Sequence, residues 1–174
     1  MLMLLTLVIQ FNDHGQLVED QTNTFAGPDF QIHGFDLHEF DLKGHLHYEV
    51  TATDVIHYPS NDTTELKAPT FAQQNENGGP LVGSADIGVI LSKGDTIRLL
   101  GNAILKQPGF GKQQEVIARS DHFTYYPDKR FAETEADVSF TSPGSTMTGT
   151  GMTADFATKV LKLQGNVKGT HATN

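Results

Sequence analysis

The stretch LHYEVTATDVIHY, residues 46–58, indicates the fold because its apolar and polar residues alternate with a period of two. One face carries the apolar side chains of Leu46, Tyr48, Val50, Ala52, Ile56 and Tyr58. The other face carries His47, Glu49, Thr51 and Thr53. Successive side chains of a β-strand point to opposite faces, so this stretch predicts a strand with one buried face.

The same alternation returns in residues 81–91, 97–105 and 132–140, and helical spacing persists nowhere. Turn-forming residues separate these runs, at positions 59–62, 77–80, 93–95, 108–109, 127–129 and 142–144. Short strands divided by tight turns predict an all-β meander that folds as a sandwich, roll or barrel.

A repeat runs through the meander, because an inward alanine recurs every 33 to 36 residues, at Ala52, Ala85, Ala118 and Ala154. The second and fourth copies end alike, in LLGNA (99–103) and LQGNV (163–167). Such a period predicts stacked antiparallel hairpins, each of which covers the apolar face of the next. The alanines either let two sheets approach or leave room for a ligand, and the sequence keeps both interpretations open.

Composition limits the function. The 174 residues suit one domain, and a net charge of -9 disfavours binding to nucleic acid. The absence of cysteine excludes disulfides, thiol chemistry and cysteine-ligated zinc.

The N-terminus predicts a division of the chain into three parts. Residues 2–11, LMLLTLVIQF, are apolar but too short to span a bilayer as a helix, so residues 1–11 are interpreted as a residual membrane-anchor segment. A buried strand or helix is the alternative. Residues 12–29 have the composition of a linker, and residues 30–174 are expected to form the folded domain.

His45 and His47 form the sequence cluster most suggestive of chemistry, since a His-x-His pair on a strand points both imidazoles to one side. A metal-dependent, cupin-like β-roll enzyme would use such a pair. However, Glu49 follows too soon for a cupin motif, His122 lies in no such motif, and a solvent-facing pair is the favoured interpretation. No catalytic set, metal site or cofactor is therefore predicted.

Residues 48–71, YEVTATDVIHYPSNDTTELKAPTF, resemble the LptC family, the inner-membrane component of the lipopolysaccharide transport bridge of Gram-negative bacteria. The resemblance continues, in the same order, through residues 83–85, 97–102, 134–138 and 148–155. It covers about residues 30–171, and its order along the chain is more specific than any single motif.

The resemblance implies an open β-jellyroll in the periplasm, held at the inner membrane by a single N-terminal anchor. It implies lipopolysaccharide as the cargo, an inner-membrane ABC transporter complex as one partner, and an LptA-like periplasmic bridge protein as another. The bridge protein would pair with the C-terminal edge strand, for which the candidates are Lys159, Leu161, Leu163, Gly165 and Val167. The shortened anchor departs from the family pattern.

Strand parity and the resemblance together suggest which residues line a groove for the acyl chains of lipid A. They are Val50, Ala52, Ile56, Ile87, Leu99, Ala103, Ala118, Phe123, Ala136, Val138 and Phe140. These residues would equally form a dry core. The soluble bridge component, which shares the repeat, is a further alternative.

Overall fold

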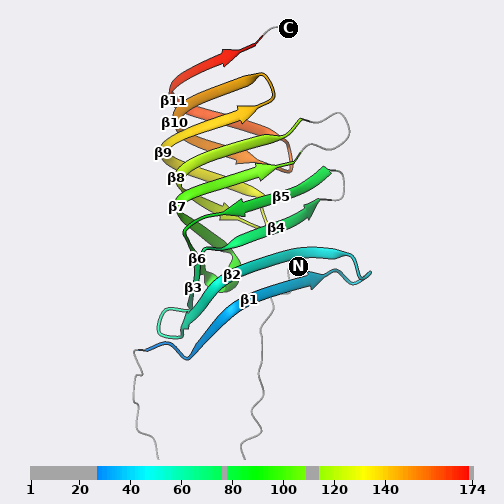
Figure 1. Ribbon diagram of the computed structural model, residues 1–174, viewed down its shortest axis with the longest axis vertical. Helices are drawn as coiled ribbons and strands as arrows, with labels where there is room; N and C mark the ends of the chain where they lie inside the picture. The colour runs from blue at the N-terminus through cyan, green and yellow to red at the C-terminus, as the bar shows by residue number, and fades with distance from the viewer. Residues whose placement is uncertain (1–26, 76–77, 109–113, 173–174) are drawn as a thin grey trace, which may run out of the picture.

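The computed structural model describes residues 27–75, 78–108 and 114–172. These residues form one antiparallel sheet of eleven strands, which confirms the predicted all-β class. Figure 1 shows the strands stacked along the long axis, with the N-terminal hairpin at one end and the last strand at the other. The strands are β1 (Phe30–Phe40), β2 (Leu46–Tyr58), β3 (Thr63–Lys67), β4 (Thr70–Asn75), β5 (Gly78–Ser84), β6 (Ile87–Leu91), β7 (Thr96–Gln107), β8 (Val116–Tyr126), β9 (Phe131–Ser142), β10 (Ser145–Asp155) and β11 (Val160–His171). Residues 78–80, predicted to lie in a turn, instead begin β5.

The sheet consists of two half-sheets, because the long strands change partners or bend near their middles. Residues 48–51 of β2 pair with β4, whereas residues 54–58 pair with β3. Likewise, residues 104–106 of β7 pair with β5, whereas residues 96–100 pair with β6. Half-sheet 1 thus contains β4 and β5, half-sheet 2 contains β3 and β6, and the longer strands pass through both.

A line of irregular residues separates the half-sheets. Gly101 and Asn102 of β7 have φ angles of 74° and 45°, and Gly151 of β10 has 74°. The pairing register shifts at these positions in β7 and β10, and shifts again in β8 between Ser120 and Thr124. Such β-bulges bend a strand, and glycine or asparagine adopts the required left-handed conformation most readily. We call this line the corner.

The corner explains part of the sequence repeat. Asn102 and Asn166 occupy equivalent positions in the two similar closing motifs, and both have positive φ angles. Asn102 donates a hydrogen bond of 2.8 Å to Asp86, and Asn166 donates one of 3.2 Å to Thr150. The alanines of the repeat are less regular, because Ala118 pairs within half-sheet 1 and Ala154 within half-sheet 2.

The corner also changes which residues of a strand face the interior. In β2, Ala52 is buried before the corner and Val55 after it, so Ile56 points to the outer face. In β6, Gly88 is buried whereas Ile87 is 46% exposed. The predicted continuous alternation is therefore wrong at Ile56 and Ile87, because the corner shifts the parity between inward and outward side chains.

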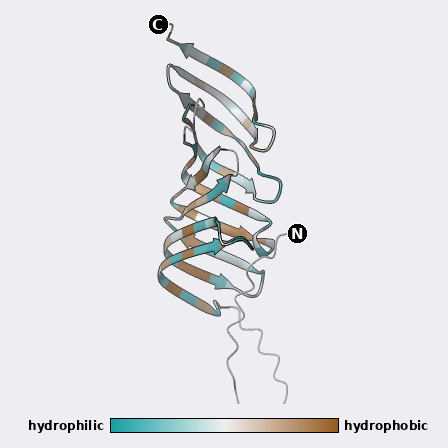
Figure 2. Cartoon of the chain, turned by 90° about the vertical axis from the view of Figure 1, so that its right-hand side faces the viewer, coloured by the Kyte–Doolittle hydropathy of each residue, from teal (hydrophilic) through white to brown (hydrophobic). Residues whose placement is uncertain are grey.

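The core comprises two clusters of buried side chains between the half-sheets. The smaller cluster, near the N-terminal end, contains Ala52, Val55 and Leu66. The larger cluster occupies the middle of the roll, and Leu99, Phe123 and Tyr125 are among its least exposed members, at 0–1% exposure. Figure 2 shows the resulting alternation of apolar and polar residues along each strand. Strand β11 is less well packed than the strands before it, since most of its residues are exposed.

Each end of the sheet presents a strand that has one neighbour among the described residues. Strand β1 pairs with β2, and β11 pairs with β10. The backbone groups along the other side of each strand are therefore available to a further strand.

Candidate functional site between the half-sheets

The inner faces of the two half-sheets enclose a narrow apolar space, which we call the seam. Its cavity measures about 30 Å³. Half-sheet 1 contributes Leu81, Leu105, Gln107, Val116, Ala118 and Phe140. From the side of half-sheet 2 come Met152, Ala154, Phe156 and Leu161.

The size of this cavity indicates that the seam is closed at the level of these residues. A water molecule occupies a share of roughly 30 Å³ in the liquid, whereas an engineered apolar cavity that binds benzene is about 150 Å³. An acyl chain is much larger than benzene. This cavity therefore has no room for such a chain unless the half-sheets move apart.

Aromatic side chains connect the half-sheets at the level of β4 and β8. The ring of Phe71, from half-sheet 1, stacks on that of Tyr125, from half-sheet 2, with centroids 5.4 Å apart and planes 17° apart. The Tyr125 ring also meets Phe156 edge-on at 6.3 Å. The Tyr125 hydroxyl donates a hydrogen bond to Oε1 of Gln73. These contacts close the interior beside the cavity that Phe156 lines.

The electrostatics of the interior favour neutral groups. Burial, together with the charges of Glu39 and Asp128, raises the pKa of Tyr48 to about 12. Burial, followed by the influence of Tyr48, raises the pKa of Tyr125 as well. Apart from Tyr125, the buried polar side chains among the described residues are those of Thr63, Gln73 and Thr134, and none of these three is ionisable. The interior is therefore suited to holding apolar groups rather than to acid–base chemistry.

Most of the predicted lining residues face the interior. Six of them are buried: Ala52, Leu99, Ala103, Ala118, Phe123 and Val138. Val50 and Phe140 are partly buried and pack against the core, and Ala136 is half-buried near the corner. Ala118 and Phe140 line the cavity itself. The sequence-based set omits the other cavity residues, although the alternation of apolar residues already included Leu81 and Leu105.

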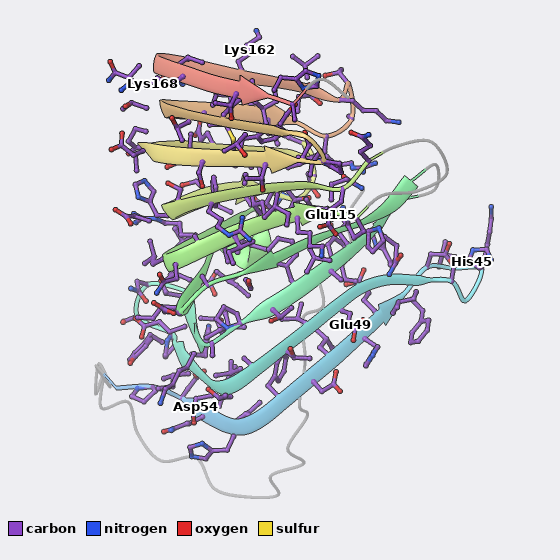
Figure 3. The ribbon with its side chains drawn as sticks, turned by 45° about the horizontal axis from the view of Figure 1, so that its top comes forward. His45, Glu49, Asp54, Glu115, Lys162 and Lys168 are labelled. Atoms are coloured by element: carbon purple, nitrogen blue, oxygen red, sulfur yellow. The ribbon has the colours of Figure 1, made fainter. Side chains whose placement is uncertain are left out.

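His45 and His47 do not share a ligand. His45 lies at the tip of the β1–β2 hairpin, as Figure 3 shows, and is 76% exposed. The two imidazoles contact different carboxylates, those of Asp41 at 3.2 Å and Glu39 at 3.4 Å. No group of three or more metal-ligating side chains is found within the part of the chain that the structure describes.

The carboxylate contacts of these histidines belong to a wider pattern. Five histidines contact carboxylates across or at the ends of the β1–β2 hairpin: His33 with Asp54, His38 with Glu49, His45 with Asp41, His47 with Glu39 and His57 with Asp29. Contacts between polar side chains on neighbouring strands support the pairing of an edge strand, so the histidines have a structural explanation.

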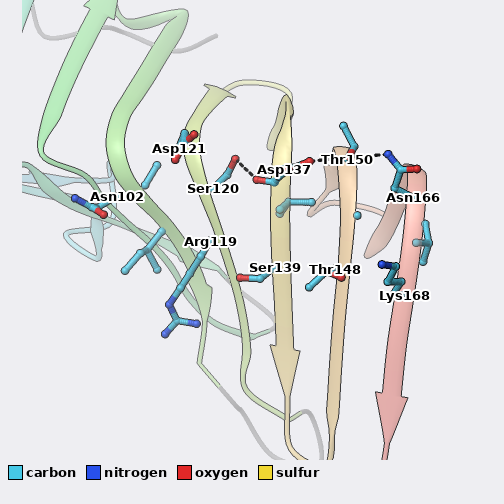
Figure 4. Close-up of a pocket in the computed structure, with 15 residues that line it drawn as sticks. Asn102, Arg119, Ser120, Asp121, Asp137, Ser139, Thr148, Thr150, Asn166 and Lys168 are labelled. Atoms are coloured by element: carbon cyan, nitrogen blue, oxygen red, sulfur yellow. Dashed lines mark hydrogen bonds between the residues drawn. The ribbon is translucent and has the colours of Figure 1, made fainter.

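A second concave region lies on the outer face of half-sheet 1, near the corner, and measures about 1000 Å³ (Figure 4). A chain of hydrogen bonds crosses it from Ser120 to the Asp137 carbonyl, from Thr150 to the Asp137 carboxylate, and from Asn166 to Thr150. No sequence pattern indicates this region, because its residues come from five strands and share no motif. These bonds hold neighbouring strands together at the corner.

The predicted partner-binding residues lie on or beside the last strand. Lys159 occupies the turn before β11 with a φ of 59°, and Leu161 and Leu163 pack against the core. Val167 is 54% exposed. Figure 3 shows Lys162 and Lys168 of the same strand at the end of the molecule opposite the β1–β2 hairpin.

The fold and the interior define a class of protein: a β-jellyroll with an apolar interior and a free strand at each end. The particular family follows from the family model for LptC-related lipopolysaccharide-assembly proteins, which matches residues 1–172. The chain belongs to this family, which is a component of lipopolysaccharide transport and not an enzyme family.

The fold agrees with that of a solved structure. The chain is similar to LptH of Pseudomonas aeruginosa, described as the LptA-homologous periplasmic component of the lipopolysaccharide transport device. The TM-score is 0.60 at 9% identity, over 72% of this chain and 95% of that chain, so the likeness concerns the fold alone. No match was found among the curated proteins. The predicted anchor, residues 1–11, lies outside the described residues, and no membrane-spanning helix is found within residues 27–75, 78–108 and 114–172.

Proposed function

We propose that this chain carries the acyl chains of lipopolysaccharide between its two half-sheets, as a periplasmic domain held at the inner membrane. The observation that carries the proposal is the apolar seam, which lies between two sheet faces and contains no ionisable group among its described lining residues. Each methylene of an acyl chain gains roughly 0.8 kcal/mol when it leaves water, so an opened seam can hold lipid A without any reaction.

The free edge strands suit the two partners that the proposal needs. The inner-membrane ABC transporter complex would deliver the lipid at the β1 end, and an LptA-like bridge protein would add a strand to β11. A chain of jellyrolls joined edge to edge would continue the seam from one protein to the next. The ATP-driven complex would supply the direction of movement.

Photocrosslinking tests the cargo and its location. Phe140 lines the cavity, whereas the preceding residue, Ser139, lies on the outer face and lines the concave region there. A benzophenone amino acid placed at position 140 in living cells is expected to capture lipopolysaccharide, and the same group at position 139 is not. Capture from position 139 alone, or from neither position, would contradict the proposal.

A further inference from the structure

Gln73 lies close to two phenol groups, one from each half-sheet. Its Oε1 accepts the hydrogen bond of Tyr125, which reaches across from half-sheet 2. Its neighbour on its own half-sheet is Tyr48, which stands directly opposite it in the β2–β4 register. Directly opposed residues on paired strands have Cβ atoms about 4.5–5.5 Å apart, so the side chains of Tyr48 and Gln73 are adjacent.

The hydroxyl of Tyr48 is buried and has no hydrogen-bond partner among the described residues. A buried hydroxyl without a partner is unfavourable, and most such groups in proteins are satisfied. Gln73 therefore has one hydroxyl donor nearby from each half-sheet. In this structure it accepts from Tyr125, the donor on the opposite half-sheet.

We propose that Phe71, Tyr125 and Phe156 form a gate across the seam, and that Gln73 switches between two donors as the gate moves. In the closed state Gln73 accepts from Tyr125 and holds the half-sheets together. In the open state Tyr125 withdraws and Gln73 accepts from Tyr48. The gate rests on the proposed function, because it gives the acyl chain its way through the seam.

The exchange of donors makes opening feasible. Breaking the Tyr125 bond alone would leave the buried acceptor of Gln73 unsatisfied. A bond from Tyr48 compensates for that loss and satisfies a hydroxyl that has no partner in the closed state. The two tyrosines thus stabilise opposite states of the same gate, so removing their hydroxyls has opposite effects.

The absence of cysteine from the sequence allows opening to be measured directly. Leu105 lines the cavity and is 3% exposed, so a Leu105→Cys variant of the full chain reacts with N-ethylmaleimide only when the seam opens. In this background, Tyr125→Phe is expected to raise the labelling rate about fivefold, which corresponds to one hydrogen bond of about 1 kcal/mol. Tyr48→Phe is expected to lower the rate.

Two controls separate the gate from general destabilisation. Tyr126 follows Tyr125 in β8, and its hydroxyl donates a hydrogen bond of 2.9 Å to Glu133. Tyr126→Phe should leave the labelling rate of Leu105→Cys unchanged. Leu66→Cys reports on the smaller core cluster, which the gate does not touch. Its labelling rate should be unchanged by Tyr48→Phe and by Tyr125→Phe.

The outcomes for the gate and for the cargo are distinct. Rates that move in the same direction for Tyr48→Phe and Tyr125→Phe, or that do not move, overturn the gate even if lipopolysaccharide is captured at position 140. Opposite shifts without capture of lipopolysaccharide support the gate and overturn the proposed cargo.

Discussion

Adding a single methyl group at Gly83 tests whether the aromatic stack is as tightly packed as the structure indicates. The new Cβ would lie 2.8 Å from Cδ1 of Phe71 and closer still to two other ring atoms. The ring cannot retreat freely, because it stacks on Tyr125. Gly83 has no positive φ in this structure, so the effect of Gly83→Ala comes from the collision rather than from backbone strain.

The magnitude follows from the two kinds of packing change. Overfilling a well-packed core costs typically about 1–3 kcal/mol. Removing the ring in Phe71→Ala costs roughly 3–5 kcal/mol, since Phe71 is 5% exposed. In the double variant the methyl group occupies space that the ring has left, so the penalty of Gly83→Ala disappears. The expected coupling energy between the two substitutions is therefore about 1–3 kcal/mol.

Urea unfolding of the full chain, followed by circular dichroism, measures the four stabilities of this cycle. Gly165→Ala is the matched control, because its nearest neighbour would lie 3.8 Å from the new Cβ and its φ is not positive. This control should be close to neutral. Additive effects of Phe71→Ala and Gly83→Ala would refute the packing that underlies the gate.

Two further predictions concern ionisation and the corner. The free energy of unfolding should fall as pH rises from about 10 towards 12, because Tyr48 has a folded pKa of about 12 and ionises near 10 when unfolded. Tyr48→Phe should weaken this dependence, and an unchanged alkaline profile would contradict the burial of the phenol. Asn102→Gly should be tolerated, whereas Asn102→Val should cost about 1–3 kcal/mol, because residue 102 has a φ of 45°. Equal melting temperatures for these two variants would argue against the left-handed corner.

Much of the fold could be predicted from local patterns. The alternation in residues 46–58 corresponds to β2, and the turn residues at 59–62 and 142–144 separate strands as expected. The predicted parity of inward and outward side chains was wrong at Ile56 and Ile87. The corner shifts this parity, and the corner depends on backbone conformation. Ala68 also has a positive φ angle, and hydropathy does not indicate this conformation. The repeated Gly-Asn pairs at 101–102 and 165–166 were the available signal.

The sequence alone could not predict that the seam is closed. Alternation assigns Ala118 and Phe140 to an inner face, but the cavity volume depends on which side chains oppose them from half-sheet 2. Met152 and Leu161 do so here. The contact between Phe71 and Tyr125 likewise joins residues 54 positions apart, and no local pattern indicates it.

The most direct test of lipid carriage between the half-sheets is to map where acyl chains contact the protein. In methyl-labelled protein mixed with lipid A, nuclear Overhauser effects from acyl methylenes are expected at Leu105, Met152 and Leu161, which line the seam. Ile104, the neighbour of Leu105 on the outer face, should show none. Contacts to Ile104 without contacts to the seam residues would contradict the claim that lipid is carried between the half-sheets.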